Sequence, residues 1–245
     1  MPAGQREAVI FVHGYNTNLA EGLYRFTQMQ HDFELRSIPI LYSWPSAASG
    51  SDYLYDRDSI LFARTGLETL IDQISRTPVE WIVLVGHSMG AQLLMEALRQ
   101  RAIRKGVLWP KLNMISLIAP DLDIDLFRAQ ARDIGKLPQP FVVFTSGRDR
   151  ALQFSEWLSG SDDKLGAIDN LDRLSKLDVM VVDTTAVQGA GIDAHLTAVT
   201  SPWMISVLKG LRRNQRFYLD HPRLMAGLPV RIVSDGRAVG LVLSP

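Results

Sequence analysis

The stretch VLVGHSMGAQLL (83–94) decides the fold of this chain. An apolar run typical of a buried strand leads into a run with helical spacing, and the turn between them places Ser88 between Gly86 and Gly90. A serine between two glycines is a pattern short enough to occur by chance. Its meaning therefore depends on the rest of the chain.

Apolar runs rich in β-branched residues recur along the sequence, and longer stretches with helical spacing separate most of them. The runs expected as strands are AVIFV (8–12), PILYSW (39–44), WIVLVG (81–86), MISLIA (114–119), FVVFTS (141–146) and DVMVVD (178–183). This alternation predicts an α/β fold in three layers, with a mostly parallel sheet of about six core strands and helices on both faces. Only residues 120–140 are available for a lid between the fourth and fifth strands, so we expect a minimal cap.

Helices are expected over 59–75, 91–103 and 205–213. In the first two, apolar residues recur on one face, as in a helix that covers a sheet. These residues are Ile60, Ala63, Leu67, Leu70, Ile71 and Ile74 in the first, and Leu94, Ala97, Leu98 and Ile103 in the second.

The end of the chain has a different character. PVRIVSDGRAVGLVL (229–243) holds two short β-type runs around Asp235-Gly236, a strong hairpin signal. We therefore expect a catalytic domain over 1–213 and an extension with a β-hairpin over 214–245. The hairpin could cap the sheet, pair across a homodimer or fold over the site, so the sequence leaves its role and the oligomeric state open.

Composition excludes several classes of function. Lysine and arginine number 26, as do aspartate and glutamate, so no net charge attracts nucleic acid or an anionic membrane. No apolar run approaches the roughly 18 residues of a membrane span, and the absence of cysteine excludes disulfides and a cysteine nucleophile. The start MPAGQREAVIFV lacks the regions of a signal peptide, so we expect a cytoplasmic protein, although a removed leader would leave no trace.

A strand, a tight turn and a helix around Ser88 form the setting in which a nucleophilic serine stands exposed above a sheet. A serine hydroxyl needs a base and an orienting carboxylate, in the chain order serine, acid, histidine. Of five histidines, only His195 falls in the loop after the last core strand, downstream of Ser88. His195 is therefore the candidate base, and the alternative is a solvated loop histidine.

Asp149 is the candidate acid, because FVVFTSGRDRAL (141–152) places it just beyond the fifth strand. There a carboxylate can meet a histidine in the loop after the next strand. Asp121, one strand earlier, is its rival. Asp123, Asp125 and Asp193 are better explained as helix caps or solvated charges.

Acyl transfer also requires N–H groups that meet the charge on the tetrahedral oxyanion. The backbone N–H of Met89 supplies one. In VIFVHGYNTN (9–18), His13-Gly14 allows a sharp turn that directs the Tyr15 N–H to the site. An ordinary glycine turn is the alternative.

Several motifs resemble the α/β-hydrolase superfamily, and more narrowly a little-characterised bacterial hydrolase family with an HGYN oxyanion loop. The motifs are HGYN (13–16), SWPS (43–46), YLYDRD (53–58), GHSMG (86–90), APDLD (119–123), TSGRDRAL (145–152) and VVDTT (181–185). The resemblance runs from about residue 8 to 210. It implies that Ser88 is the nucleophile, His195 the base and Asp149 the acid, with Tyr15 and Met89 as oxyanion donors. Trp44, Tyr53 and Tyr55 would lie near the mouth of the site as substrate-binding residues, or else pack under loops.

Two departures stand out. In IDAHLTAV (192–199) the glycine that such families place directly before the histidine is missing. The chain also begins almost at the oxyanion strand, without the first two strands of the superfamily, so we expect a small sheet or a shortened chain.

The expected function is that of a serine esterase or lipase-like enzyme on a small acyl ester of short or medium chain, with no metal and no cofactor. An acyltransferase or thioesterase using the same triad, and a catalytically silent scaffold acting as a binding module, remain the alternatives.

Overall fold

The structure is a computed structural model, and it describes residues 6–32, 37–145, 163–183, 230–234 and 237–240. Its strands are β1 (Glu7–Val12), β2 (Ile38–Tyr42), β3 (Trp81–His87), β4 (Leu112–Ile118), β5 (Phe141–Thr145), β6 (Val179–Asp183), β7 (Val230–Ser234) and β8 (Arg237–Gly240). Its helices are α1 (Leu19–Asp32), α2 (Tyr53–Ser75), α3 (Met89–Lys105) and α4 (Ile124–Ile134), with short 3₁₀ turns η1 (Leu165–Ala167) and η2 (Leu171–Leu174).

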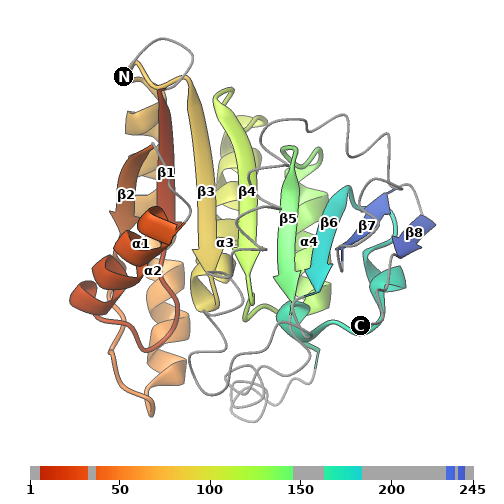
Figure 1. The fold of residues 1–245 in the computed structure, drawn as a ribbon, viewed down its shortest axis with the longest axis horizontal. Coiled ribbons are helices and arrows are strands. Elements are labelled where there is room, and N and C mark those ends of the chain that lie inside the picture. The colour runs from red at the N-terminus through yellow and green to blue at the C-terminus, as the bar shows by residue number, and fades with distance from the viewer. Residues whose placement is uncertain (1–5, 33–36, 146–162, 184–229, 235–236, 241–245) are drawn as a thin grey trace.

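In the described residues the strands form one sheet in the order β2-β1-β3-β4-β5-β6-β7-β8 (Figure 1). Strands β1 to β6 are parallel, while β7 pairs antiparallel with β6 and with β8. Helix α1 lies on one face of the sheet, and α2, α3 and α4 lie on the other (Figure 1). The predicted fold, a mostly parallel sheet of about six core strands covered by helices, is confirmed.

The strands read as apolar runs because both faces of the sheet are covered. Every residue of β1 and β5 is buried, as are six of the seven residues of β3. The apolar face predicted for α2 packs on the sheet, with Ile60, Ala63, Leu67 and Ile71 buried. In α3 the prediction for Ile103 was wrong, because this side chain near the end of the helix is 63% exposed.

Two predicted boundaries differ from the structure. The strand expected over 39–44 ends at Tyr42, because Trp44 bonds to His13 and leaves the ladder. Helix α2 begins at Tyr53, six residues before its predicted start. Helix α3 begins at Met89, directly after Ser88, as the strand, turn and helix setting around Ser88 predicts, and its amphipathic stretch was expected over 91–103.

The predicted hairpin around 235–236 is present, since β7 and β8 pair antiparallel on either side of these two residues. The hairpin pairs with β6 and extends the sheet at that edge, which corresponds to the expectation that it caps the sheet. The division into domains at 213 stays a prediction.

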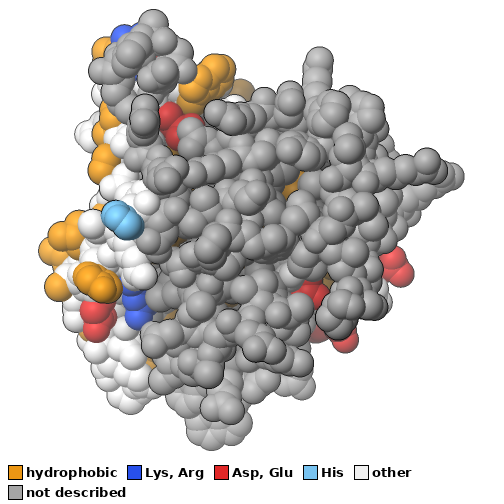
Figure 2. Space-filling view, viewed as in Figure 1, with side chains coloured by type: hydrophobic (Ala, Val, Ile, Leu, Met, Phe, Trp, Pro, Cys, Tyr) orange, Lys and Arg blue, Asp and Glu red, His pale blue; other side chains and the backbone are white. Residues whose placement is uncertain are grey.

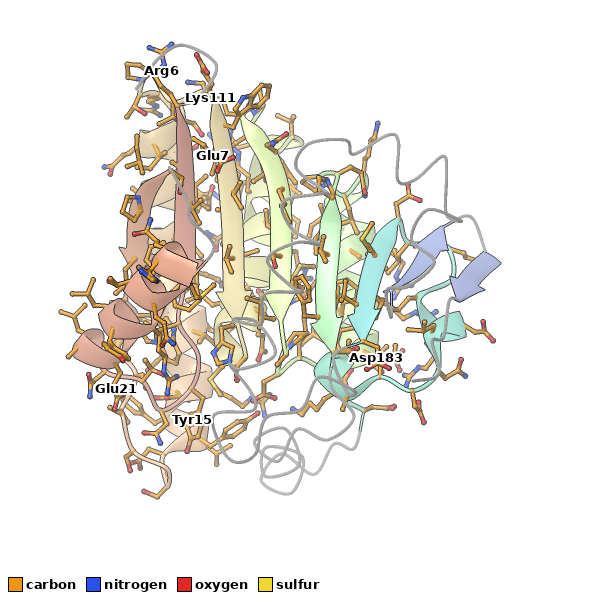
Figure 3. The ribbon with its side chains drawn as sticks, viewed as in Figure 1. Arg6, Glu7, Tyr15, Glu21, Lys111 and Asp183 are labelled. Carbon is orange, nitrogen blue, oxygen red and sulfur yellow. The ribbon has the colours of Figure 1, made fainter. Side chains whose placement is uncertain are left out.

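Register sets the position of the site. Val12 at the end of β1 lies opposite Gly86 near the end of β3, so the segments that follow these strands leave the sheet at the same level. Figure 3 shows Tyr15 and Asp183 at this carboxyl edge, whereas Arg6 and Lys111 lie at the opposite edge.

The surface carries apolar side chains on α1, where Leu19, Leu23 and Tyr24 are exposed. Apolar atoms gather along the left margin of the face in Figure 2, the side on which α1 lies in Figure 1. Among the described helices, none is both long enough and apolar enough to cross a membrane.

Candidate active site

Ser88 occupies the turn between β3 and α3 with φ 51° and ψ −123°. This is a conformation that a residue with a side chain rarely adopts, and it persists only where neighbouring bonds hold it. Ser88 N donates to the Ile118 carbonyl (2.9 Å), and the Ser88 carbonyl accepts from Ala91 N (3.0 Å). The turn is thus held by the next strand and by the first turn of α3.

Glycines surround Ser88 because backbone lies where a Cβ would stand. A Cβ at position 86 would lie 2.7 Å from Ala91 Cα, and one at position 90 would lie 2.3 Å from the His13 carbonyl oxygen. From the opposite side, a Cβ at Gly14 would lie 2.9 Å from Ser88 Cβ. The segment after β1 therefore packs directly against the turn that carries Ser88.

We call residues His13–Asn16 the oxyanion loop, after their predicted role, and the side chains of His13 and Trp44 hold its first two peptide groups. Trp44 N donates to His13 Nε2 (3.2 Å), so we assign the proton to Nδ1, which donates to the Gly14 carbonyl (3.0 Å). The Gly14 carbonyl and the Tyr15 N–H belong to one planar peptide group, so this bond directs the Tyr15 N–H to the opposite side. The Trp44 indole donates to the His13 carbonyl (2.8 Å) and stacks on the imidazole, with the ring centroids 5.0 Å apart.

Burial lowers the pKa of His13 below its ordinary value of 6.5, although the bond to Gly14 and the charge of Asp56 act in the opposite direction. The neutral imidazole is the form that this arrangement needs. A proton on Nε2 would remove the acceptor of the Trp44 N–H.

The last peptide group of the oxyanion loop is held at both ends. Thr17 Oγ1 donates to the Tyr15 carbonyl (3.0 Å), and Asn16 N donates to Asp56 Oδ2 (3.3 Å). The Tyr15 hydroxyl donates to the Ser49 carbonyl (3.1 Å), which anchors its side chain away from its backbone.

The two candidate oxyanion donors lie on the elements that meet at Ser88. Met89 is the first residue of α3, and the first N–H groups of a helix have no partner within it and form the positive end of the helix dipole. Tyr15 N follows Gly14, which packs against Ser88. Outside helices and strands, the described residues contain no backbone hydrogen bond that occupies either N–H.

The three aromatic residues predicted near the mouth differ in exposure. Trp44 and Tyr53 are 3% and 2% exposed, so both side chains are buried, and their role in substrate binding stays a prediction. The Tyr53 ring contacts Tyr15 edge to face, with centroids 5.4 Å apart. Tyr55 is 57% exposed.

Asp121, the rival acid, is buried, and two side chains among the described residues engage it. The Tyr53 hydroxyl donates to it at 3.0 and 3.2 Å, and Lys164 Nζ lies 2.9 Å from its Oδ1. Lys164 is itself only 5% exposed. Asp123 caps α4, as expected, by accepting from the backbone N–H groups of residues 125 and 126.

Asp149 and His195 lie outside the described residues. The strands that precede them are described: β5 ends at Thr145, β6 ends at Asp183, and these two residues are paired neighbours in the sheet. Their assignment as acid and base stays a prediction.

Sequence reasoning gave no role to Asp56 or to Lys164. Asp56 lies in the quoted motif YLYDRD (53–58), ahead of the helix predicted from residue 59, and that motif was the only signal for it. Lys164 carried no signal, because its partner lies 43 positions away in the sequence.

The parallel sheet, the glycine-flanked serine between strand and helix, and the loop packed against it define the α/β-hydrolase class. Residues 3–212 match the model of a family described as "Alpha/beta hydrolase of unknown function (DUF900)", and the chain belongs to this family. It is therefore a hydrolase of the α/β-hydrolase fold. A comparison with curated proteins gives no match.

Solved structures similar to this one include a dienelactone hydrolase from Anabaena variabilis, 14% identical over 90% of this chain and 88% of that chain, with a TM-score of 0.48. Another is an esterase from the archaeon Pyrobaculum calidifontis, 12% identical over 87% of this chain and 79% of that chain, with a TM-score of 0.47. At these values the likenesses carry no argument about activity.

Proposed function

We propose that this protein is a serine hydrolase that cleaves carboxylic esters with short or medium acyl groups through Ser88, His195 and Asp149. The backbone of Ser88 carries the proposal. Its φ of 51° between β3 and α3, with glycines on both sides where a Cβ would meet backbone, supports a nucleophile held above the sheet.

In the proposed reaction His195 takes the proton of Ser88, and Ser88 Oγ attacks the ester carbonyl carbon. The Met89 and Tyr15 N–H groups hold the oxyanion. His195 then gives the proton to the leaving alkoxide, and an alcohol departs from the acyl-enzyme. Water, deprotonated by His195, attacks the acyl carbon. As the tetrahedral intermediate collapses, His195 returns that proton to Ser88 Oγ and the carboxylic acid is released.

The engagement of Asp121 supports Asp149 as the acid. A carboxylate that is already bound to the Lys164 ammonium and the Tyr53 hydroxyl is less able to hold an imidazole. The connection from β4 to β5 contains α4, which covers the sheet, and no further helix or strand. This connection therefore supplies no separate cap domain, which is consistent with short or medium acyl groups.

Hydrolysis of p-nitrophenyl esters of increasing acyl length tests the proposal. We expect turnover by the wild type and a loss of about 10⁴-fold or more in Ser88→Ala. Folded Asp149→Asn should be inactive while folded Asp121→Asn remains active, and the reverse result would exchange their roles. No turnover of any ester by folded wild type would favour the silent scaffold.

A further inference from the structure

We propose that Asp56 is a positioning residue that holds the oxyanion loop in register with Ser88. This inference rests on the proposed function. Asp56 lies in the first turn of α2 and is fully buried, at 0% exposed. Its carboxylate joins two loops that follow neighbouring strands, the one after β1 and the one after β2.

Three donors converge on the carboxylate. Oδ2 accepts from Asn16 N (3.3 Å) and from Ser46 Oγ (2.7 Å), and Oδ1 accepts from Ala47 N (2.7 Å). An ionised carboxylate only accepts hydrogen bonds, and this set consists only of donors. The N-terminal turn of α2 also favours a negative charge. In the part of the chain that the structure describes, no cation forms an ion pair with Asp56.

A buried carboxylate is costly, and an apolar side chain in its place would commonly stabilise a core more. The two loops explain why a carboxylate stands here. Asn16 and Ala48 both have positive φ, 49° and 50°, a region that asparagine tolerates but alanine avoids. Ala48 N in turn donates to Ser46 Oγ (3.1 Å), so the hydroxyl bound to Asp56 also restrains the strained backbone at Ala48.

The bond to Asn16 acts on the site directly. Asn16 N and the Tyr15 carbonyl belong to one peptide group, so the carboxylate restrains the C-terminal side of the residue whose N–H is the proposed oxyanion donor. The other loop held by Asp56 follows β2 and contains Trp44, whose backbone and indole N–H groups bond to His13 on the N-terminal side of Tyr15. A single side chain thus links both restraints on Tyr15.

The substitution Asp56→Asn tests the role, because it keeps the shape but turns an NH₂ group toward a donor. We expect kcat for p-nitrophenyl esters to fall roughly 10- to 100-fold with KM within about twofold, because an oxyanion contact strengthens only in the transition state. A fluorophosphonate should still modify Ser88, but more slowly. Asp58→Asn, an exposed site on the same helix, is the matched control and should keep wild-type kcat.

Ser46→Ala removes one bond to the carboxylate without changing its charge, and it replaces Asp56→Asn if that variant does not fold. We expect a smaller fall in kcat, again with KM little changed. Wild-type kcat in folded Asp56→Asn or, failing that, in folded Ser46→Ala would overturn the inference, as would an equal loss in Asp58→Asn. An inactive and unlabelled wild type would instead refute the proposed function itself.

Discussion

Gly90→Ala should separate the oxyanion loop from the nucleophile. The added Cβ would lie 2.3 Å from the His13 carbonyl oxygen and 2.5 Å from the Val12 carbonyl oxygen. Real Cβ atoms essentially never approach below 3.0 Å, so backbone must move by about 0.7 Å to go from 2.3 to 3.0 Å. Both neighbours are backbone atoms of β1 and its loop, which cannot rotate away as a side-chain end could.

A displacement of about 1 Å in a catalytic group costs on the order of 100-fold in rate, so we expect kcat for p-nitrophenyl esters to fall about 10- to 100-fold. Overpacking should also cost about 1–3 kcal/mol of unfolding free energy, measured by urea denaturation. Gly22→Ala on α1 is the control, because its Cβ would meet its nearest neighbours at 3.6 Å, an ordinary contact. Wild-type kcat in Gly90→Ala would refute the packing of this loop against Ser88.

Two further predictions concern stability. Asp121→Asn leaves the buried Lys164 ammonium without its counter-charge and should lower the unfolding free energy by about 3–5 kcal/mol. Asp125→Asn, at an exposed ion pair, is the control and should keep a melting temperature close to that of the wild type. Equal melting temperatures for the two variants would contradict this prediction. The pKa of His13 is lower in the folded protein than in the unfolded chain, so as the pH is lowered the unfolded chain takes up this proton at a higher pH than the folded protein does. The unfolding free energy should therefore decrease as the pH drops below about 6.5, by at most about 1.4 kcal/mol per pH unit. Urea titrations from pH 7.5 to 5.5 should show a weaker pH dependence in His13→Gln than in the wild type or in exposed His31→Gln, and an unchanged slope in His13→Gln would count against the neutral, buried imidazole.

Much of the sheet was predictable because a parallel strand covered on both faces must be apolar along its whole length. All six core strands were located within two residues at each end. The start of α2 was missed for a physical reason. Its first turn buries Asp56 and exposes Leu54 and Tyr55, the reverse of an amphipathic pattern, because that turn holds the loops of the site.

The site was predictable where chemistry restricts the backbone. Gly86 and Gly90 stood out as positions where a side chain would collide with neighbouring elements, and the structure shows these close approaches, with a further one at Gly14, where only a sharp turn was expected. Contacts between distant side chains left no local pattern, and the bond between Asp121 and Lys164 is the clearest case. Such pairs depend on where the loops meet, which neither spacing nor composition encodes.

The most direct test of the central claim is the intact mass of the protein after treatment with a fluorophosphonate, followed by peptide mapping. This reagent reports an activated serine without knowledge of the natural substrate. We expect one adduct, located at Ser88, in the wild type and none in His195→Ala. An unmodified, folded wild-type protein would contradict the assignment of Ser88 as an activated nucleophile.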